Sequence, residues 1–251
     1  MGKSIVTAGT VISIKPLGEN NSSVCFLTRD NGIVYATMYG GRKSKLKSLV
    51  SPWNTGIIYF SSTNNTNQLK INDFDVKSYH LSFRESLVKS WAANLAAEIA
   101  IKTKCAASNE QCWTLISGFL DGLDYCKTNE QCSLGLIRFL WRYLNLLGIQ
   151  PDAGCCCKCD TSSVYFNKGV YYSTSENGFI CTECSSQKQP FYLTQEAVRY
   201  LACLSVCSPQ EARAIPLSKE ASGQIKDLVF FLIENACGSR LKSLETGIGI
   251  L

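Results

Sequence analysis

Along the first 80 residues, apolar and β-branched positions alternate with polar ones or form short runs, a pattern typical of β-strands. Turn signals separate these runs, including the hairpin signal Asp30-Asn31-Gly32 and a polar loop at residues 62–67. The strands are predicted at residues 7–15, 23–28, 32–39, 57–61 and 68–79. Five short strands are typical of a small barrel of the OB type, which binds oligonucleotides on one face, and an SH3-like barrel fits the count almost as well.

From Ser82 onward the apolar residues recur every three or four positions, which predicts helices. Ser82 and Glu85 have the spacing of a capping box, so the first helix is expected to begin at Ser82. Further helices are predicted at about residues 109–125, 131–147, 194–206 and 217–236. The predicted fold class is therefore α+β and multidomain, with an OB-type barrel at residues 1–80 and an α-helical domain at residues 81–251.

Four cysteines form two C-x2-C pairs, Cys156 with Cys159 and Cys181 with Cys184. Two thiolates at this spacing can bind one tetrahedral metal ion, so the two pairs predict a structural zinc site. The intervening segment reads as short strands at residues 164–166, 170–172 and 179–180, as in a zinc ribbon. We place this ribbon at residues 152–188, inserted in the helical domain. Four thiolates would fill every coordination position of zinc and leave none for a substrate water.

Three consecutive cysteines, Cys155, Cys156 and Cys157, leave the register of the first pair open. Cys156 is favoured because the other two would give less common spacings with Cys159. A redox C-x-x-C motif, a disulfide framework and thiols that simply pack in the core are the alternatives to a metal site. The redox alternative is disfavoured because the pair leads into strand-like sequence, whereas a thioredoxin motif opens a helix.

Positive charge is concentrated near the N-terminus. Residues 1–80 carry nine Lys and Arg against four Asp and Glu, whereas the rest of the chain carries sixteen of each. The net charge of +5 therefore belongs to the first 80 residues, as expected of a module that binds nucleic acid.

The densest basic run follows Gly40 and Gly41, in the connection between the third and fourth predicted strands. Glycines let backbone approach phosphates, and Lys or Arg neutralises them with release of counterions. The candidate DNA contacts are Arg42, Lys43, Lys45 and Lys47. A solvated basic loop without a ligand is the alternative. Nearby aromatic residues could stack on bases, although aromatic residues in strands more often lie in the core; they are Tyr35, Tyr39, Trp53 and Tyr59.

His80 is the only histidine, which excludes H-E-x-x-H and any mechanism that needs two histidines. The sequence has no Walker P-loop and no G-x-S-x-G nucleophile motif, and His80 lacks the nearby Glu that zinc deaminases use. A structural His80 is preferred, and the chain is not expected to be an enzyme. No apolar run approaches the length of a membrane span and no secretory signal is visible, so we expect a cytoplasmic protein with reduced thiols.

Several short motifs follow one another in a defined order and resemble the RecO family of bacterial recombination mediators over nearly the full chain. One departure is Asp160, which stands where the family usually has Gly in Cys-x-x-Cys-Gly. The motifs are Gly9-Thr10-Val11-Ile12-Ser13, Pro16-Leu17-Gly18-Glu19-Asn20, Tyr39-Gly40-Gly41-Arg42-Lys43-Ser44-Lys45-Leu46, Leu147-Gly148-Ile149-Gln150-Pro151, the two cysteine pairs with Gly178-Phe179-Ile180 before the second, and Arg240-Leu241-Lys242-Ser243.

The resemblance implies a protein without enzymatic activity that binds single- and double-stranded DNA, anneals complementary strands and helps load the recombinase RecA onto gapped DNA. It also implies RecR and single-strand-binding protein as partners, a structural zinc ion, and a cytoplasmic, nucleoid-associated location. Two alternatives from other classes stay open. One is a zinc-ribbon adaptor that does not bind DNA, and the other is an enzyme with a reactive cysteine near His80.

Overall fold

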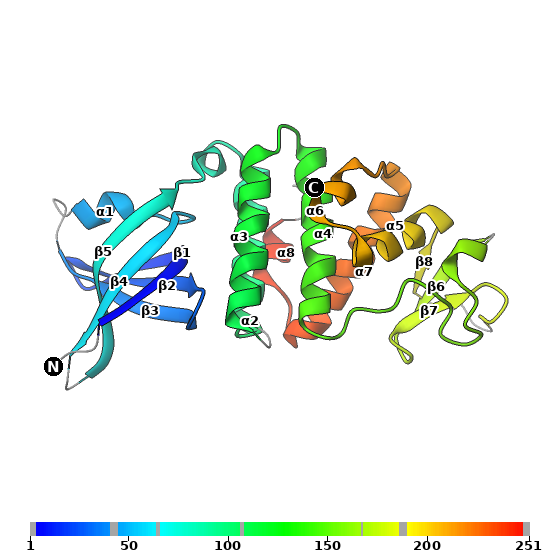
Figure 1. Cartoon of the computed structure of the whole chain (residues 1–251), viewed down its shortest axis with the longest axis horizontal. Coiled ribbons are helices and arrows are strands. Elements are labelled where there is room, and N and C mark those ends of the chain that lie inside the picture. Colours follow the sequence, from blue (N-terminus) through cyan, green and yellow to red (C-terminus); the bar gives the residue numbers. More distant parts are fainter. Residues whose placement is uncertain are drawn as a thin grey trace. The chain divides into compact units, whose positions relative to one another are not determined.

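The computed structural model describes residues 4–40, 45–63, 66–105, 108–166, 168–185 and 190–247 (Figure 1). The chain forms two compact units, Met1–Gly135 with Arg240–Leu251, and Leu136–Ser239. In the described part of the chain, no helix is long and apolar enough to cross a membrane.

A closed five-stranded barrel opens the chain, with strand order β1-β2-β3-β5-β4 (Figure 1). Strand β1 pairs with β4 through its first half and with β2 through its second half, and a parallel contact between β3 and β5 completes the closure. The predicted OB-type barrel is thus confirmed. The strands are β1 (Ser4–Leu17), β2 (Asn21–Thr28), β3 (Gly32–Met38), β4 (Thr55–Thr63) and β5 (Thr66–Ser78).

Alternation along the strands places one set of apolar side chains inside the barrel. Phe26 lies at the centre, with its ring 5.4 Å from that of Phe60 and 6.1 Å from that of Phe74, both edge to face. Such aromatic pairs contribute about 0.5–1.5 kcal/mol each beyond the area they bury. The Asp30-Asn31-Gly32 hairpin forms as predicted, and Gly32 adopts the left-handed conformation that favours glycine (φ 64°).

The rest of the chain is mainly helical, as predicted, with a small sheet in the cysteine region whose strand order is β7-β6-β8. The predicted ranges for α3 and α5 match closely, because Ser108 and Thr194 cap the first turns of these helices. The elements are η1 (Leu81–Arg84), α2 (Leu87–Lys102), α3 (Asn109–Tyr125), α4 (Asn129–Leu146), η2 (Ser163–Tyr165), β6 (Val170–Ser173), β7 (Gly178–Cys181), β8 (Phe191–Leu193), α5 (Gln195–Val206), α6 (Pro209–Ala214), α7 (Lys219–Cys237) and α8 (Lys242–Thr246).

The capping box predicted at Ser82 is wrong. Helix α2 begins at Leu87, and its cap is Ser86, whose side chain accepts a hydrogen bond from the Lys89 backbone N–H. The Ser82 hydroxyl instead donates to the Asp124 carboxylate and accepts a hydrogen bond from the Lys89 ammonium at 3.0 Å. The Ser82 side chain, expected as a helix cap, is therefore bonded to Asp124 on α3 and Lys89 on α2.

Two other local predictions differ from the structure. Residues 164–166, expected as a strand, lie at a 3-10 turn in which the Ser162 side chain accepts the Val164 N–H. The connection between β3 and β4 contains a short helix, α1 (Lys45–Leu49), instead of only a loop. Leu46 and Leu49 pack against the barrel core, which explains why this segment becomes ordered as a helix.

Helix α3 and the barrel are joined by polar contacts within the first unit. The buried ring of His80 lies between two acceptors: Nδ1 is 2.7 Å from the Trp53 carbonyl oxygen, and Nε2 is 2.9 Å from Asp121 Oδ1. At the other end of α3, Arg29 Nε donates to Glu110 Oε1 at 2.9 Å. His80 therefore has the structural place expected for it, linking the end of β5 to the segment before β4 and to α3.

The C-terminal helix α8 is anchored on α2 by Glu98. This carboxylate accepts the backbone N–H groups of Lys242 at 3.0 Å and Ser243 at 2.8 Å, the first donors of α8. Burial disfavours the charged form of Glu98, but the hydrogen bonds from Ser243 and Lys242 and the charge of Lys102 outweigh it, so the pKa of Glu98 is lowered.

We predict that Glu98→Gln lowers the free energy of unfolding by about 1–2 kcal/mol at pH 7, because the uncharged amide is a weaker acceptor for the orphan donors of α8. Since the folded-state pKa of Glu98 is lowered, its contribution is present above the unfolded pKa of about 4.3 and is lost as the pH falls through the folded value. Urea unfolding at pH 7 and at pH 3 measures both effects. Glu19→Gln in an exposed turn is the control, and equal stability of wild type and Glu98→Gln at pH 7 would contradict the prediction.

Candidate metal centre and nucleic-acid interface

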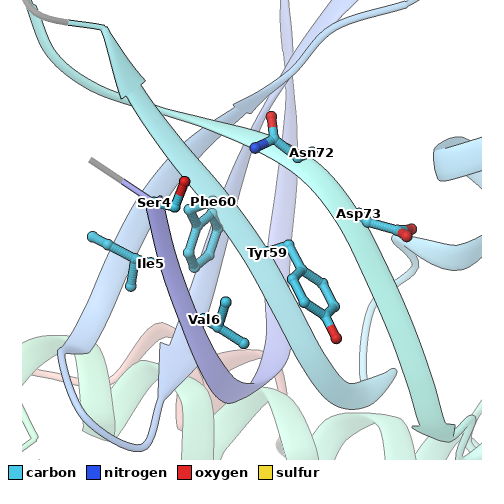
Figure 2. Close-up of a pocket in the computed structure, with 7 residues that line it drawn as sticks. All are labelled: Ser4, Ile5, Val6, Tyr59, Phe60, Asn72 and Asp73. Atoms are coloured by element: carbon cyan, nitrogen blue, oxygen red, sulfur yellow. The ribbon is translucent and has the colours of Figure 1, made fainter. Parts of the chain in front are cut away.

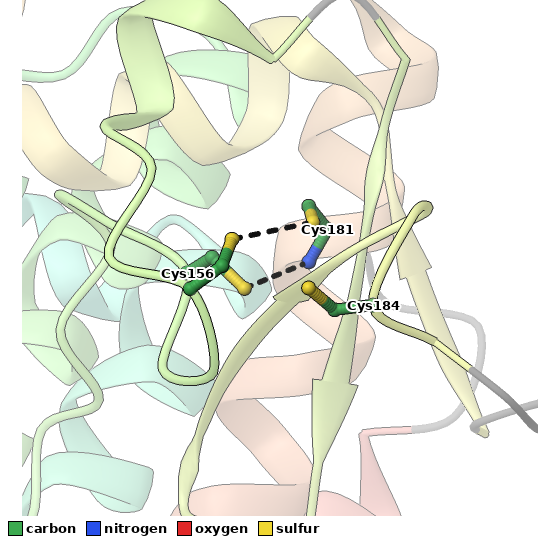
Figure 3. A group of neighbouring side chains, drawn as sticks. Cys156, Cys181 and Cys184 are labelled. Atoms are coloured by element: carbon green, nitrogen blue, oxygen red, sulfur yellow. Dashed lines mark hydrogen bonds between the residues drawn. The ribbon is translucent and has the colours of Figure 1, made fainter.

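The two cysteine pairs come together in the second unit, although 21 residues separate them in sequence. Cys156 and Cys159 lie in a turn before η2, Cys181 ends β7, and Cys184 lies in the turn that follows. Their four sulfur atoms all lie within 4.8 Å of one another, and Figure 3 shows Cys156, Cys181 and Cys184 converging. The four could hold one metal ion.

Backbone hydrogen bonds shape both turns around the sulfurs. In the first turn, the Asp160 N–H donates to the Cys156 carbonyl at 2.9 Å. In the second, the N–H groups of Cys184 and Ser185 both donate to the Cys181 carbonyl. The Cys181 N–H points at Cys156 Sγ at 3.4 Å, which ties the two turns together (Figure 3). Such N–H···S contacts are the outer-shell support that orients thiolate ligands.

Asp160 adopts the left-handed conformation, with φ 57°. Glycine occupies this region without steric cost, which accounts for the Gly that the RecO family usually has after the first cysteine pair. Asp tolerates the region better than most residues, because its short polar side chain hydrogen-bonds locally. The departure at Asp160 therefore leaves the geometry of the first turn intact.

The four thiols differ in burial, and the pKa values of Cys159 and Cys184 are shifted in opposite directions. Cys156 and Cys181 are buried, Cys184 is half-buried and Cys159 is exposed. Hydrogen bonds from the side chain and backbone of Thr161, and then from Cys156 and Cys184, lower the pKa of Cys159 to about 6. Hydrogen bonds with Cys159 and Cys181 raise the pKa of Cys184 to about 12. A metal ion binds thiolates, so the lowered pKa of Cys159 favours metal binding and the raised pKa of Cys184 opposes it.

The donor set fits zinc in kind and in spacing. A tetrahedral site with Zn–S bonds of about 2.3 Å has sulfurs roughly 3.8 Å apart. Cys159 Sγ and Cys181 Sγ are 3.8 Å apart. The group includes Cys156 but neither of its neighbours: Cys155 Sγ donates to Asp152 Oδ2 at 3.4 Å, and Cys157 is exposed outside the cluster. The four sulfurs that lie together thus include Cys156, the residue favoured from the sequence, and the ligand register stays a prediction.

Of the four predicted DNA contacts, Arg42 and Lys43 lie outside the described residues. Lys45 and Lys47 are on α1, and both side chains are exposed. Within the described part of the chain, neither has an acidic partner; the ion pairs of the barrel are Arg29 with Glu110 and Lys77 with Asp75. The two lysines therefore face solvent on a helix that packs against β5.

The aromatic residues considered for stacking divide into two groups. Trp53 is buried, with only 8% of its surface exposed, so it belongs to the core and is not available for stacking on bases. Tyr35, Tyr39 and Tyr59 are exposed on the barrel. Two exposed lysines, Lys15 on β1 and Lys70 on β5, were not singled out from the sequence. Strand alternation marks them as outward-facing, but only the barrel closure shows that they share a row.

A closed OB-type barrel followed by helices with an inserted four-cysteine ribbon defines a class of modular proteins in which a small barrel is followed by a helical part with a candidate metal site. The profile of one family, described as "Recombination protein O C terminal", matches residues 84–245. The chain therefore belongs to the RecO family of DNA repair proteins.

Curated relatives extend the similarity to the barrel. The "DNA repair protein RecO" of Bacillus velezensis is 24% identical over 242 residues, which cover 94% of this chain and 90% of the relative. The protein of the same name from Bacillus subtilis gives the same identity and coverage. That of Symbiobacterium thermophilum is 24% identical over 244 residues, covering 94% of both chains.

We predict that Cys181→Ser weakens zinc affinity by more than about 100-fold, because loss of even an outer-shell partner costs 10–100-fold. Cys157→Ser, beside the cluster but outside it, should leave both zinc content and affinity unchanged. Competition with a chromogenic chelator measures the affinity, and elemental analysis measures the content. Unchanged zinc affinity in Cys181→Ser would contradict its role as a ligand, and weakened affinity or loss of zinc in Cys157→Ser would show that the register of the first pair is wrong.

Proposed function

We propose that this protein is a recombination mediator that binds single- and double-stranded DNA through its barrel, anneals complementary strands and helps load the RecA recombinase onto single-stranded DNA. RecR and single-strand-binding protein are the proposed partners. Membership of a DNA repair family supports the general role. The finer activities rest on the resemblance of the ordered motifs and on the charge distribution of the chain.

The observation that carries the DNA-binding part is the exposed basic segment on a barrel with an excess of positive charge. Lys45 and Lys47 point into solvent without carboxylate neighbours among the described residues, so each can neutralise a phosphate and release counterions. We assign the same role to Arg42 and Lys43, which precede them in the chain. Backbone contacts of this kind hold DNA without regard to sequence, which suits a protein that must act at any gap.

We propose zinc as the metal of the four-cysteine group, with Cys156, Cys159, Cys181 and Cys184 as its ligands. The ion would supply folding energy to the ribbon and no catalysis, because four sulfurs complete the tetrahedral shell. We therefore propose that the protein is not an enzyme. The domain boundary near residue 80 and the ribbon limits of 152–188 stay predictions.

We predict that the double variant Lys45→Glu with Lys47→Glu binds fluorescent single-stranded DNA at least ten-fold more weakly, and that the slope of log affinity against log salt decreases by about 1.4, or about 0.7 for each lost phosphate contact. Fluorescence anisotropy at several salt concentrations measures both quantities. The control is Lys168→Glu with Lys219→Glu, which changes the net charge equally by reversing two exposed lysines of the second unit.

Equal losses in the two double variants would mean that net charge, and not the basic segment, governs binding. If the wild-type protein shows no salt-dependent affinity for DNA, the DNA-binding proposal is wrong. A zinc-ribbon adaptor that recruits proteins would then be the better description.

A further inference from the structure

A polar row crosses four strands on the outer face of the barrel. Lys15 on β1 pairs with Ser23 on β2, Ser23 pairs with Thr37 on β3, and Thr37 pairs with Lys70 on β5. Residues directly opposite each other in neighbouring strands point to the same face of a sheet. The next residues along β2 and β3, Val24 and Ala36, lie in the barrel core, so the row faces outward.

The row has a lysine at each end and two hydroxyls between them. Adjacent strands are about 4.8 Å apart, so the three steps from Lys15 to Lys70 span about 14 Å at the backbone. Both lysines are exposed, and neither has an acidic partner in the described part of the chain. Lysine and hydroxyl side chains are common donors to phosphate oxygens.

An exposed aromatic ring lies beside the row. Tyr39 follows Thr37 by two residues and exposes 48% of its surface. The Lys70 ammonium lies over the Tyr39 ring, 5.7 Å from its centroid, in a cation–π contact. A flat ring next to a phosphate-binding cation is the combination that sequence-independent proteins use for unpaired bases.

Other parts of the barrel surface suit a polynucleotide less well. A pocket of about 300 Å³ on β1, β4 and β5 includes Val6, Tyr59 and the carboxylate of Asp73 (Figure 2). Asp75 follows on the same strand and is paired with Lys77. Carboxylates at this position repel phosphate. The pocket therefore offers the ring of Tyr59 but no positive charge for the DNA backbone.

Toward the other end of β2, outward-facing side chains are also buried. Cys25 and Leu27 alternate with the core residues Val24 and Phe26 and so point outward, yet both are at most 2% exposed. Helix α3 packs against β2 and β3 and covers this end. The Lys15–Lys70 row lies at the opposite end of the same strands. Helix α1, with Lys45 and Lys47, packs against the strand that carries Lys70.

We propose that single-stranded DNA crosses the barrel along this row, with phosphates at Lys15 and Lys70, hydrogen bonds from Ser23 and Thr37, and one base stacked on Tyr39. The inference rests on the proposed DNA-binding function and extends it beyond residues 42–47. It also gives the site a preference. Stacking on Tyr39 requires an unpaired base, so the row distinguishes single strands from duplex, whereas lysines alone do not.

The first test is Tyr39→Ala, with Tyr59→Ala in the pocket on β1, β4 and β5 as the control and Tyr39→Phe as the conservative variant. Fluorescence anisotropy is measured with a labelled single-stranded oligonucleotide and with the corresponding duplex. Tyr39→Ala should weaken single-strand binding about ten-fold or more, as for loss of one stacked base, and leave duplex binding within about two-fold. Tyr39→Phe and Tyr59→Ala should bind as wild type does.

The second test is the double variant Lys15→Gln with Lys70→Gln, for which the salt slope with single strands should fall by about 1.4. Lys77→Gln, on the same strand as Lys70, is the control.

If both row variants bind single strands as wild type does while the Lys45 and Lys47 variant does not, the row inference is wrong and the proposed function stands. Equal loss of single-strand and duplex binding in Tyr39→Ala would overturn the stacking. Absence of salt-dependent binding in the wild type would overturn the proposed function itself.

Discussion

The packing of α3 against the barrel is the constraint on which the organisation of the first unit depends. Two outward-facing residues of β2, Cys25 and Leu27, are buried, and α3 packs against β2 and β3. Polar contacts hold the arrangement at both ends of the helix, with Arg29 on Glu110 and His80 on Asp121. Both ring nitrogens of His80 face an oxygen acceptor, so a change at this position affects two partners at once. Removing the ring would leave acceptors unpaired, which costs about 1–3 kcal/mol for each group that stays buried.

Because α3 occupies one end of the β2–β3 face, the surface left on the barrel divides by charge. One side has Lys15, Lys70 and Tyr39, and the side formed by β1, β4 and β5 has Tyr59 with Asp73. Tyr39 and Tyr59 are both exposed aromatic rings, so the charges next to each ring determine which of them suits a negatively charged ligand. Helix α1 contacts β5, with its apolar residues packed against the barrel core and its lysines exposed to solvent. Packing of Leu46 and Leu49 against the barrel core thus determines that the lysines of α1 are exposed.

Local patterns predicted those parts of the fold that depend on neighbours in sequence. The barrel strands follow from period-two alternation, and α3 follows from its Ser108 cap and apolar stripe. The C-x2-C pairs were visible for the same reason, because each pair forms within one turn. Predictions failed where a residue distant in sequence determined the local structure. The Ser82 hydroxyl bonds to Asp124 instead of capping a helix, and Leu46 packs against the barrel core, so that a segment expected as a loop forms α1. The Lys15–Lys70 row could not be predicted either, since it depends on the parallel β3–β5 contact that closes the barrel.

The cysteine site and the barrel surface contribute to function in different ways. The four sulfurs belong to one compact unit, and the strands with the basic row belong to the other. A fully sulfur-coordinated ion has no open position, so its effect is confined to the turns that it joins and to the β6–β7 hairpin between them. In the second unit, Tyr172 of β6 and Phe191 of β8 both pack on Phe231 of α7, which connects the small sheet to a helix beyond the metal turns. Because the four-cysteine group and the proposed DNA-binding face belong to different units, defects in metal binding and in DNA binding should be separable by mutation.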